Sequence, residues 1–146
     1  MGFSVSGSAA IVFAGMFIAF GMFYSASSNT MEEVTDARSD WQDQTLAQQN
    51  TDVDIAEATY NASTESLIVT VDNNGSTTLS VAETDLLVDN AYQTTFQNRS
   101  VDGDATTDLW TPGTRLTYNV SLASQPDRVK VATGTGVSAT EVVVSG

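Results

Sequence analysis

The segment Leu67–Gly75 has the sequence LIVTVDNNG, in which a run rich in β-branched residues is followed by a polar turn. Leu67, Val69 and Val71 would share one face of a strand, as expected for a strand with one buried side. Asn73-Asn74-Gly75 supplies residues that tolerate left-handed backbone conformations, so a turn is expected there. The segment predicts one strand of an antiparallel sheet.

The same pattern extends on both sides of this strand, from Thr51 to the C-terminus. Further strands are predicted at 53–60, 78–81, 85–88, 92–96, 114–122, 129–133 and 137–145. Turns are predicted at 61–64, 89–90, 102–104 and 110–113, where Pro112 fixes φ and Gly113 can adopt a positive φ. Short strands spaced by about 8 to 12 residues, without helical segments between them, predict an antiparallel Greek-key sandwich.

Alternation along these strands also predicts the core. The expected core residues are Val53, Ile55, Tyr60, Leu67, Val69, Val71, Leu79, Val81, Leu86, Val88, Phe96, Leu109, Leu116, Tyr118, Val120, Val129, Val131, Val142 and Val144. Trp110 stands beside the Pro-Gly turn and has two interpretations, a cap that packs on the core or a binding residue; packing is favoured.

The first 31 residues contain no charged side chain, and residues 9–26 read AAIVFAGMFIAFGMFYSA. At about 1.5 Å per helical residue, the run from about Val5 to Ala26 can cross a hydrocarbon core about 30 Å thick. Bulky residues on every face argue against a buried helix of a soluble domain. The expected membrane-anchor residues are Ala9, Ile11, Phe13, Phe17, Phe20 and Phe23. A cleaved signal peptide is the alternative, although the basic leader is missing and Ser25-Ala26-Ser27 is a weak cleavage match.

Gly7, Ala10, Ala14 and Gly21 form a stripe of small residues along this predicted helix. Such stripes allow transmembrane helices to approach closely, although Gly and Ala are also common in membrane helices that stay single. Both interpretations remain open at this point.

Residues 31–50 read MEEVTDARSDWQDQTLAQQN and contain neither Gly nor Pro, which predicts a helical stalk. Val34, Trp41 and Gln48 recur at intervals of seven, but the apolar stripe is too thin for a sustained coiled coil. A stalk paired with a neighbour and a solvated spacer are both open. The expected domains are therefore a transmembrane anchor (1–30), a stalk (31–50) and an extracytoplasmic β-sandwich (51–146).

The chain has 18 acidic residues against 5 basic ones, a formal net charge of −13. This balance argues against nucleic acid and anionic lipid as partners and is typical of proteins that work in high salt. A surface that binds cations or a basic partner is the alternative. The sequence has no Cys and no His, which removes Ser-His and Cys-His catalysis and imidazole metal sites. We expect no enzymatic activity and no cofactor.

Two sets of residues are candidate sites. Asp102, Asp104 and Asp108 offer the oxygen ligands that calcium prefers, but they lack the spacing of an EF-hand, and solvated turns are favoured over a metal site. No two carboxylates are fixed across a cleft as a hydrolase requires. The second set consists of four Asn-X-Ser/Thr glycosylation sequences, at Asn61, Asn74, Asn98 and Asn119. The first three fall at predicted turns, and the fourth lies inside a predicted strand.

Three segments carry a resemblance to a known family: MGFSVSGSAAIVFAGMFIAFGMFYSASS at the N-terminus, LLVDNAY at 86–92 and VDGDATTDLWTPG at 101–113. They resemble the FlaF (ArlF) family of haloarchaeal archaellum accessory proteins, and the similarity extends over the whole chain. The resemblance implies an all-β immunoglobulin-like antiparallel sandwich with one N-terminal transmembrane α-helix and a helical stalk. It also implies a place between the membrane and the surface layer. The potential glycosylation sites and the lack of any cytoplasmic-type site likewise predict that the sandwich lies outside, with the N-terminus cytoplasmic.

The resemblance further implies partners: the surface-layer protein, and the archaellum G-type stator protein with which the family anchors the stationary part of the motor. A sandwich binds through its loops or an open strand edge, so the expected partner surface contains Asp102, Asp104, Trp110 and one edge strand. Homodimerisation is a further hypothesis. Two alternatives stay open. One is an archaellin or type IV pilin-like filament subunit, although Met1-Gly2-Phe3 lacks the basic residue of its leader; the other is a membrane-tethered ion- or solute-binding module.

Overall fold

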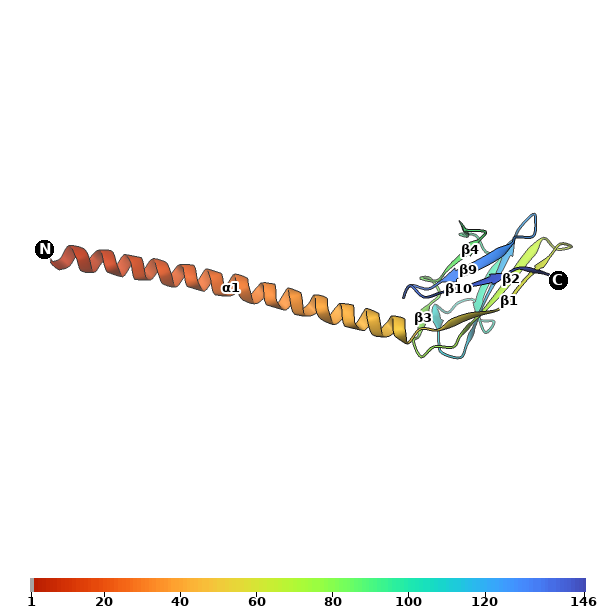
Figure 1. Ribbon diagram of the computed structural model, residues 1–146, viewed down its shortest axis with the longest axis horizontal. Coiled ribbons are helices and arrows are strands. Elements are labelled where there is room, and N and C mark those ends of the chain that lie inside the picture. Colours follow the sequence, from red (N-terminus) through yellow and green to blue (C-terminus); the bar gives the residue numbers. More distant parts are fainter. Residues whose placement is uncertain (1) are drawn as a thin grey trace. The chain divides into compact units, whose positions relative to one another are not determined.

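The computed structural model describes the backbone of residues 2–146 and the side chains of residues 6–26, 31 and 33–146. Met1-Gly2-Phe3 and Ser27, which bear on N-terminal processing, lie outside the described side chains. The chain forms two compact units, residues 1–43 and 44–146, and each is described by itself (Figure 1). The second unit begins before the predicted boundary at residue 51, because it includes the last helical turn.

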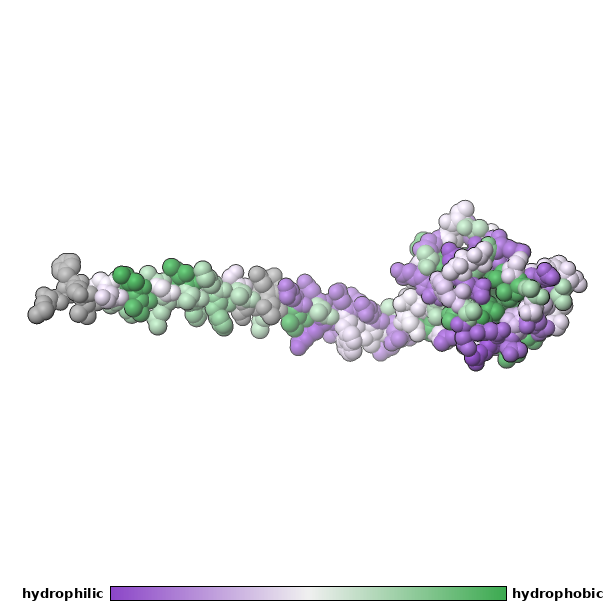
Figure 2. All heavy atoms as spheres, turned by 90° about the horizontal axis from the view of Figure 1, so that it is seen from above, coloured by the Kyte–Doolittle hydropathy of each residue, from purple (hydrophilic) through white to green (hydrophobic). Residues whose placement is uncertain are grey.

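One uninterrupted helix, α1 (Gly2–Gln49), contains both the apolar segment and the predicted stalk. Because this stretch contains no Pro, every backbone N–H beyond the first turn can join the helical hydrogen-bond ladder. Hydrophobic side chains follow the first part of the helix and hydrophilic ones the second (Figure 2). The stalk predicted for 31–50 is therefore helical as far as Gln49.

The second unit is an all-β sandwich. Its strands are β1 (Val53–Asn61), β2 (Ser66–Asn73), β3 (Leu79–Ser80), β4 (Asp85–Val88), β5 (Ala91–Tyr92), β6 (Asn98–Val101), β7 (Leu109–Trp110), β8 (Arg115–Ser121), β9 (Arg128–Ala132), β10 (Ser138–Val142) and β11 (Val144–Ser145). One sheet has the order β11-β1-β2-β8-β6, a second has β10-β9-β4-β5, and β3 pairs with β7 (Figure 1).

This topology is immunoglobulin-like. The order β1-β2-β8-β6 matches the A-B-E-D sheet of that fold, and β4, β9 and β10 match strands C, F and G. All strand pairs are antiparallel except β1 with β11, where Thr59 lies opposite Val144. The antiparallel sandwich predicted from alternation is therefore confirmed, with one parallel pair that alternation does not indicate.

Most of the predicted core is buried, and the exceptions have clear causes. Val142 and Val144 are 65% and 57% exposed, contrary to prediction, whereas Val143 is buried. The chain leaves the second sheet after Val142 and joins the first at Val144, so the inward-facing position falls between them. Alternation within a single strand cannot show such a change of sheet.

Three further differences concern single positions. Leu109 is 63% exposed, contrary to prediction, whereas its neighbour Trp110 is fully buried, as the packing interpretation expected. Phe96 is only partly buried, although its ring contacts Tyr118 with the centroids 5.2 Å apart. Ala58 is buried because the pairing of β1 with β2 shifts by one residue between Ile55 and Glu57, and this bulge restores the inward direction.

The turns divide into confirmed and incorrect predictions. Gly113 has φ +77°, as expected, and Asp89 and Asn90 have φ +48° and +66°, which suits the tight hairpin between β4 and β5. The segment Asn73–Gly75 has no residue with positive φ, so that prediction was wrong. A Cβ on Gly75 would lie 2.5 Å from the Asn50 carbonyl oxygen, so close backbone approach explains glycine there.

Candidate functional site

The apolar part of α1 is the first candidate functional element. Residues 6–26 have a mean hydropathy of 1.9, and none of this segment is buried. The large anchor residues Ile11, Phe13, Phe17, Phe20 and Phe23 are all at least 62% exposed. Ala9 is exposed as well, and a Cβ on Gly7 or Gly21 would meet no neighbouring atom. By length and composition, the segment fits a single-pass membrane anchor or a signal sequence.

The last turn of the helix belongs to the sandwich unit and is fixed to it. The final carbonyl groups of a helix lack partners within the helix. Here the Ala47 carbonyl accepts a hydrogen bond from the Thr51 hydroxyl (2.7 Å) and another from the Thr77 hydroxyl (3.3 Å). The Asn50 carbonyl accepts from the backbone N–H groups of Ser76 and Thr77. The β2–β3 loop therefore caps this turn.

The loop after β6 was the predicted partner surface, and its first turn is tightly built. Val101 and Asp104 exchange two backbone hydrogen bonds of 2.9 Å around Asp102 and Gly103, whose φ values are +49° and +89°. The Asp102 carboxylate accepts a hydrogen bond from the Arg115 backbone N–H (3.1 Å). Asp102 and Asp104 are both exposed, so they remain candidates for contact with a partner.

The three aspartates do not converge on a common point. Asp104 accepts hydrogen bonds from the Thr106 hydroxyl and backbone N–H, which lower the pKa of its carboxyl group. Asp108 accepts from the Ala82 N–H (2.7 Å) and the Ser80 hydroxyl (2.9 Å), and its pKa is lowered too. Across the described residues, no group of three or more carboxylates could hold a metal ion. Asp108 instead joins the loop to the segment after β3.

Trp110 does not belong to the surface, so its inclusion in the partner surface was wrong. Its side chain is fully buried, and its indole N–H donates a hydrogen bond of 3.0 Å to the Thr114 carbonyl. The Asn73 amide donates to the Trp110 carbonyl (3.1 Å) and to the Thr77 carbonyl (3.0 Å). The Pro-Gly turn after Trp110 therefore closes the core, as the packing interpretation expected.

A polar depression of about 260 Å³ lies beside this loop, lined by Asp72, Asn74, Asp102, Gly113 and Arg115. Within it, the Arg115 guanidinium donates two hydrogen bonds to the Asp72 carboxylate, at 2.7 and 3.0 Å. This is the one ion pair among the described side chains. The guanidinium lowers the pKa of Asp72, opposed by partial burial, so the charge of Arg115 is already neutralised.

The four glycosylation sequences differ in environment. Asn74 and Asn98 are exposed, in the loop after β2 and at the start of β6. Asn61, half buried at the end of β1, accepts hydrogen bonds from the N–H groups of Ser63 and Thr64. Asn119 lies within β8, and its side-chain oxygen is buried without a hydrogen-bond partner. Of the three sites predicted at turns, only Asn74 lies in a loop, because Asn61 ends β1 and Asn98 begins β6.

The open strand edges can now be assigned. Strands β11 and β6 end the first sheet, and β10 and β5 end the second. Strands β5 and β11 have only two residues each, whereas β10 has five and ends at the exposed Val142. An open edge presents unpaired N–H and C=O groups to which a partner strand can add. Of the four edges, β10 is the longest.

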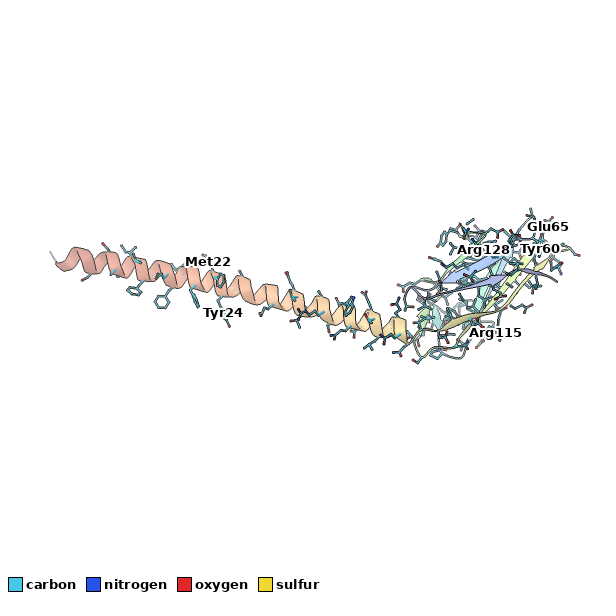
Figure 3. The ribbon with its side chains drawn as sticks, in the orientation of Figure 1. Met22, Tyr24, Tyr60, Glu65, Arg115 and Arg128 are labelled. Carbon is cyan, nitrogen blue, oxygen red and sulfur yellow. The ribbon has the colours of Figure 1, made fainter. Side chains whose placement is uncertain are left out.

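Sequence reasoning did not single out Arg128 and Lys130, which stand two residues apart on β9 and are exposed. Arg128 lies on the second sheet and Arg115 on the first (Figure 3). The sequence feature that could have indicated these two residues is Arg-Val-Lys, which lies at the start of a predicted strand of a chain with only five basic residues. Alternation places both cations on the face opposite the buried Val129.

No model of a known protein family matches the sequence, and no curated protein matches it. Solved structures with some similarity include the I10 domain of titin (12% identity, TM-score 0.35, 64% of this chain and 99% of that domain). A CARDB domain from Pyrococcus furiosus has 15% identity and TM-score 0.38, over 65% of this chain and 93% of that one. The ligand binding region of serine-glutamate repeat protein A from Enterococcus faecium has 15% identity and TM-score 0.36, over 66% and 99%. At these values the comparisons carry no argument about function.

Proposed function

We propose that this chain is a non-enzymatic component of the archaellum motility machinery, which anchors the motor stator by binding the surface layer from the membrane. In this proposal α1 crosses the membrane once, with the N-terminus in the cytoplasm. The sandwich lies between the membrane and the surface layer. The resemblance of residues 1–28, 86–92 and 101–113 to the FlaF (ArlF) family supports this assignment.

The observation that carries the proposal is the exposure of the apolar segment of α1. None of the 21 residues of this segment is buried, so its apolar side chains would be exposed if water surrounded the helix. Moving each large apolar side chain from water into an apolar environment is favourable by about 1.5–3 kcal/mol, which favours a place in a membrane. The sandwich, in contrast, has a complete core of its own. A protein with one apolar helix and one closed domain is suited to holding that domain at a membrane.

The surface of the sandwich is compatible with a protein that binds a partner and does not catalyse a reaction. The loop carboxylates accept hydrogen bonds from backbone N–H and hydroxyl groups, and Asp72 is neutralised by Arg115. The unpaired edge of β10, part of which lies close to β1, offers a main-chain surface for a partner. The surface layer and the G-type stator protein are the partners we propose.

The test is retention of the full chain by the surface layer. Vesicles that carry the reconstituted chain would be mixed with isolated surface-layer sheets in molar salt and sedimented, and vesicles without the chain serve as the control. We expect only the loaded vesicles to co-sediment. Equal sedimentation of loaded and empty vesicles would remove the surface-layer proposal.

A further inference from the structure

The outer face of the second sheet carries Arg128 and Lys130, two of the five basic residues of the chain. We define the β9 face as Asp85, Leu87, Tyr92, Arg128, Lys130, Thr140 and Val142. In the sheet register, Lys130 lies opposite Leu87 and Thr140, and Arg128 lies opposite Val142. Directly opposed residues share one face of a sheet, so these side chains form a single surface.

The two cations of this face are not neutralised by carboxylates of the chain. Among the described side chains, neither Arg128 nor Lys130 forms an ion pair. The Arg128 guanidinium donates a hydrogen bond to the neutral Asn90 amide oxygen (3.2 Å). In a chain with net charge −13, two adjacent unpaired cations are an unusual concentration of positive charge.

Two carboxylates beside these cations, Asp85 and Asp89, accept hydrogen bonds from other groups. Asp85 accepts a hydrogen bond from the Tyr92 hydroxyl (3.0 Å), which raises the pKa of that hydroxyl. Asp89 accepts from the backbone N–H groups of Asp127 and Arg128, both at 3.0 Å. These bonds hold the carboxylates in turns and strand contacts, so the positive ends of Arg128 and Lys130 remain available.

The surroundings of the cations suit a protein partner. Arg128 and Lys130 border a depression of about 190 Å³ together with Leu87, Asn90 and Thr140. Exposed apolar side chains flank it, with Val142 65% and Tyr92 60% accessible to solvent. Tyrosine and arginine beside apolar area are enriched at protein interfaces.

We propose that the β9 face docks on a carboxylate-bearing surface of a different protein, with Arg128 and Lys130 binding the carboxylates. A second copy of this chain is disfavoured, because a two-fold interface through this face would set cations against cations. The inference deepens the proposed function by assigning the face through which the sandwich holds its partner, and it rests on that function only for the partner's identity.

Lys130 provides a direct test, because it is the only lysine in the chain. Treatment of intact cells that express the full chain with a water-soluble carbodiimide joins a lysine amine to a carboxylate in contact with it, as an amide, with the carbodiimide taking up the oxygen as a urea. Mass spectrometry then identifies both joined residues. We expect Lys130 linked to an Asp or Glu of another protein.

Three variants distinguish the effect of the Lys130 charge on binding from a nonspecific effect of substitution. Lys130→Arg keeps the charge and should keep co-sedimentation with the partner, while the carbodiimide link disappears. Lys130→Glu should weaken binding about tenfold, since it sets a carboxylate against a carboxylate. Arg38→Glu makes the same charge change on an exposed residue of α1 and should leave binding unchanged.

The outcomes distinguish the inference from the proposed function. A link from Lys130 to the surface-layer protein supports both. A link to an acid of some other identified protein supports the inference and removes the surface-layer proposal. A Lys130 that stays unlinked, or that links to a second copy of this chain in isotope-mixed cells, overturns the inference, as does equal binding of Lys130→Glu and Arg38→Glu.

Discussion

At the scale of single residues, Leu109 and Trp110 show how one step along a strand separates the core from the surface. Trp110 is fully buried, while Leu109 is 63% exposed. Trp110→Ala should lower the free energy of unfolding by about 3–5 kcal/mol, because it leaves a large cavity. Leu109→Ala should change it by no more than about 0.5 kcal/mol. Denaturant unfolding of the full chain in detergent micelles, followed by circular dichroism, measures both, and equal effects would contradict the assigned burial.

Asp72 predicts a pH dependence at the same scale. The Arg115 guanidinium lowers the pKa of Asp72 below its ordinary value of 3.8, so the folded state binds a proton there less readily than the unfolded state. The resulting stabilisation is fully present above pH 3.8 and is lost as the pH falls through the lowered pKa. Asp72→Asn should therefore remove part of the acid dependence of stability below about pH 4.

Denaturation midpoints between pH 2 and 7 measure this effect. Asp43→Asn, a change to an exposed carboxylate of α1, is the control and should keep the acid dependence of the wild-type sandwich. The side chains of Arg115 and Asp72 are 55% and 32% exposed, so added salt should reduce the difference. An Asp72→Asn variant with an unchanged pH profile would show that the ion pair does not contribute to stability.

At the scale of elements, the end of α1 depends on hydroxyl groups of the sandwich unit. Thr51→Val removes the 2.7 Å hydrogen bond to the Ala47 carbonyl and keeps the side-chain shape. The loss of about 1 kcal/mol should speed amide exchange of Asn50 and Thr51 about fivefold. Thr35→Val, which removes a hydroxyl bond to the Met31 carbonyl in the same helix, should leave these two amides unchanged. Equal exchange in the two variants would argue against the cap.

The elements also show what a sequence can and cannot predict. Alternation placed Leu67, Val69 and Val71 correctly because β2 lies in the middle of one sheet and keeps its partners throughout. The prediction was wrong at Val142 and Val144, where the chain changes sheets. The alternation of apolar and polar residues within one strand does not indicate with which strand it pairs. For the same reason, the sequence alone could not show that β10 is the longest edge strand. It also could not show that Lys130 forms no ion pair with the described side chains.

The three loop aspartates, for which solvated turns were favoured over a metal site, illustrate a different physical limit. Residue type alone made Asp102, Asp104 and Asp108 a joint candidate for a cation site. In the structure, each carboxylate accepts hydrogen bonds from different neighbouring groups. Short loops satisfy acidic side chains locally, with backbone N–H and hydroxyl groups, before a distant ligand is needed. Chemistry-bearing residues close in sequence are therefore weak evidence of a common site.

At the scale of the whole molecule, the proposed function makes a definite prediction about which side of the membrane the sandwich occupies. The chain has no cysteine, so a single introduced thiol is a unique label. Ser124→Cys places it in the exposed loop between β8 and β9. A membrane-impermeant maleimide should label this variant in intact cells as fully as in lysed cells. Labelling only after lysis would place the sandwich inside the cell and exclude surface-layer binding, and the cysteine-free parent chain reports any background.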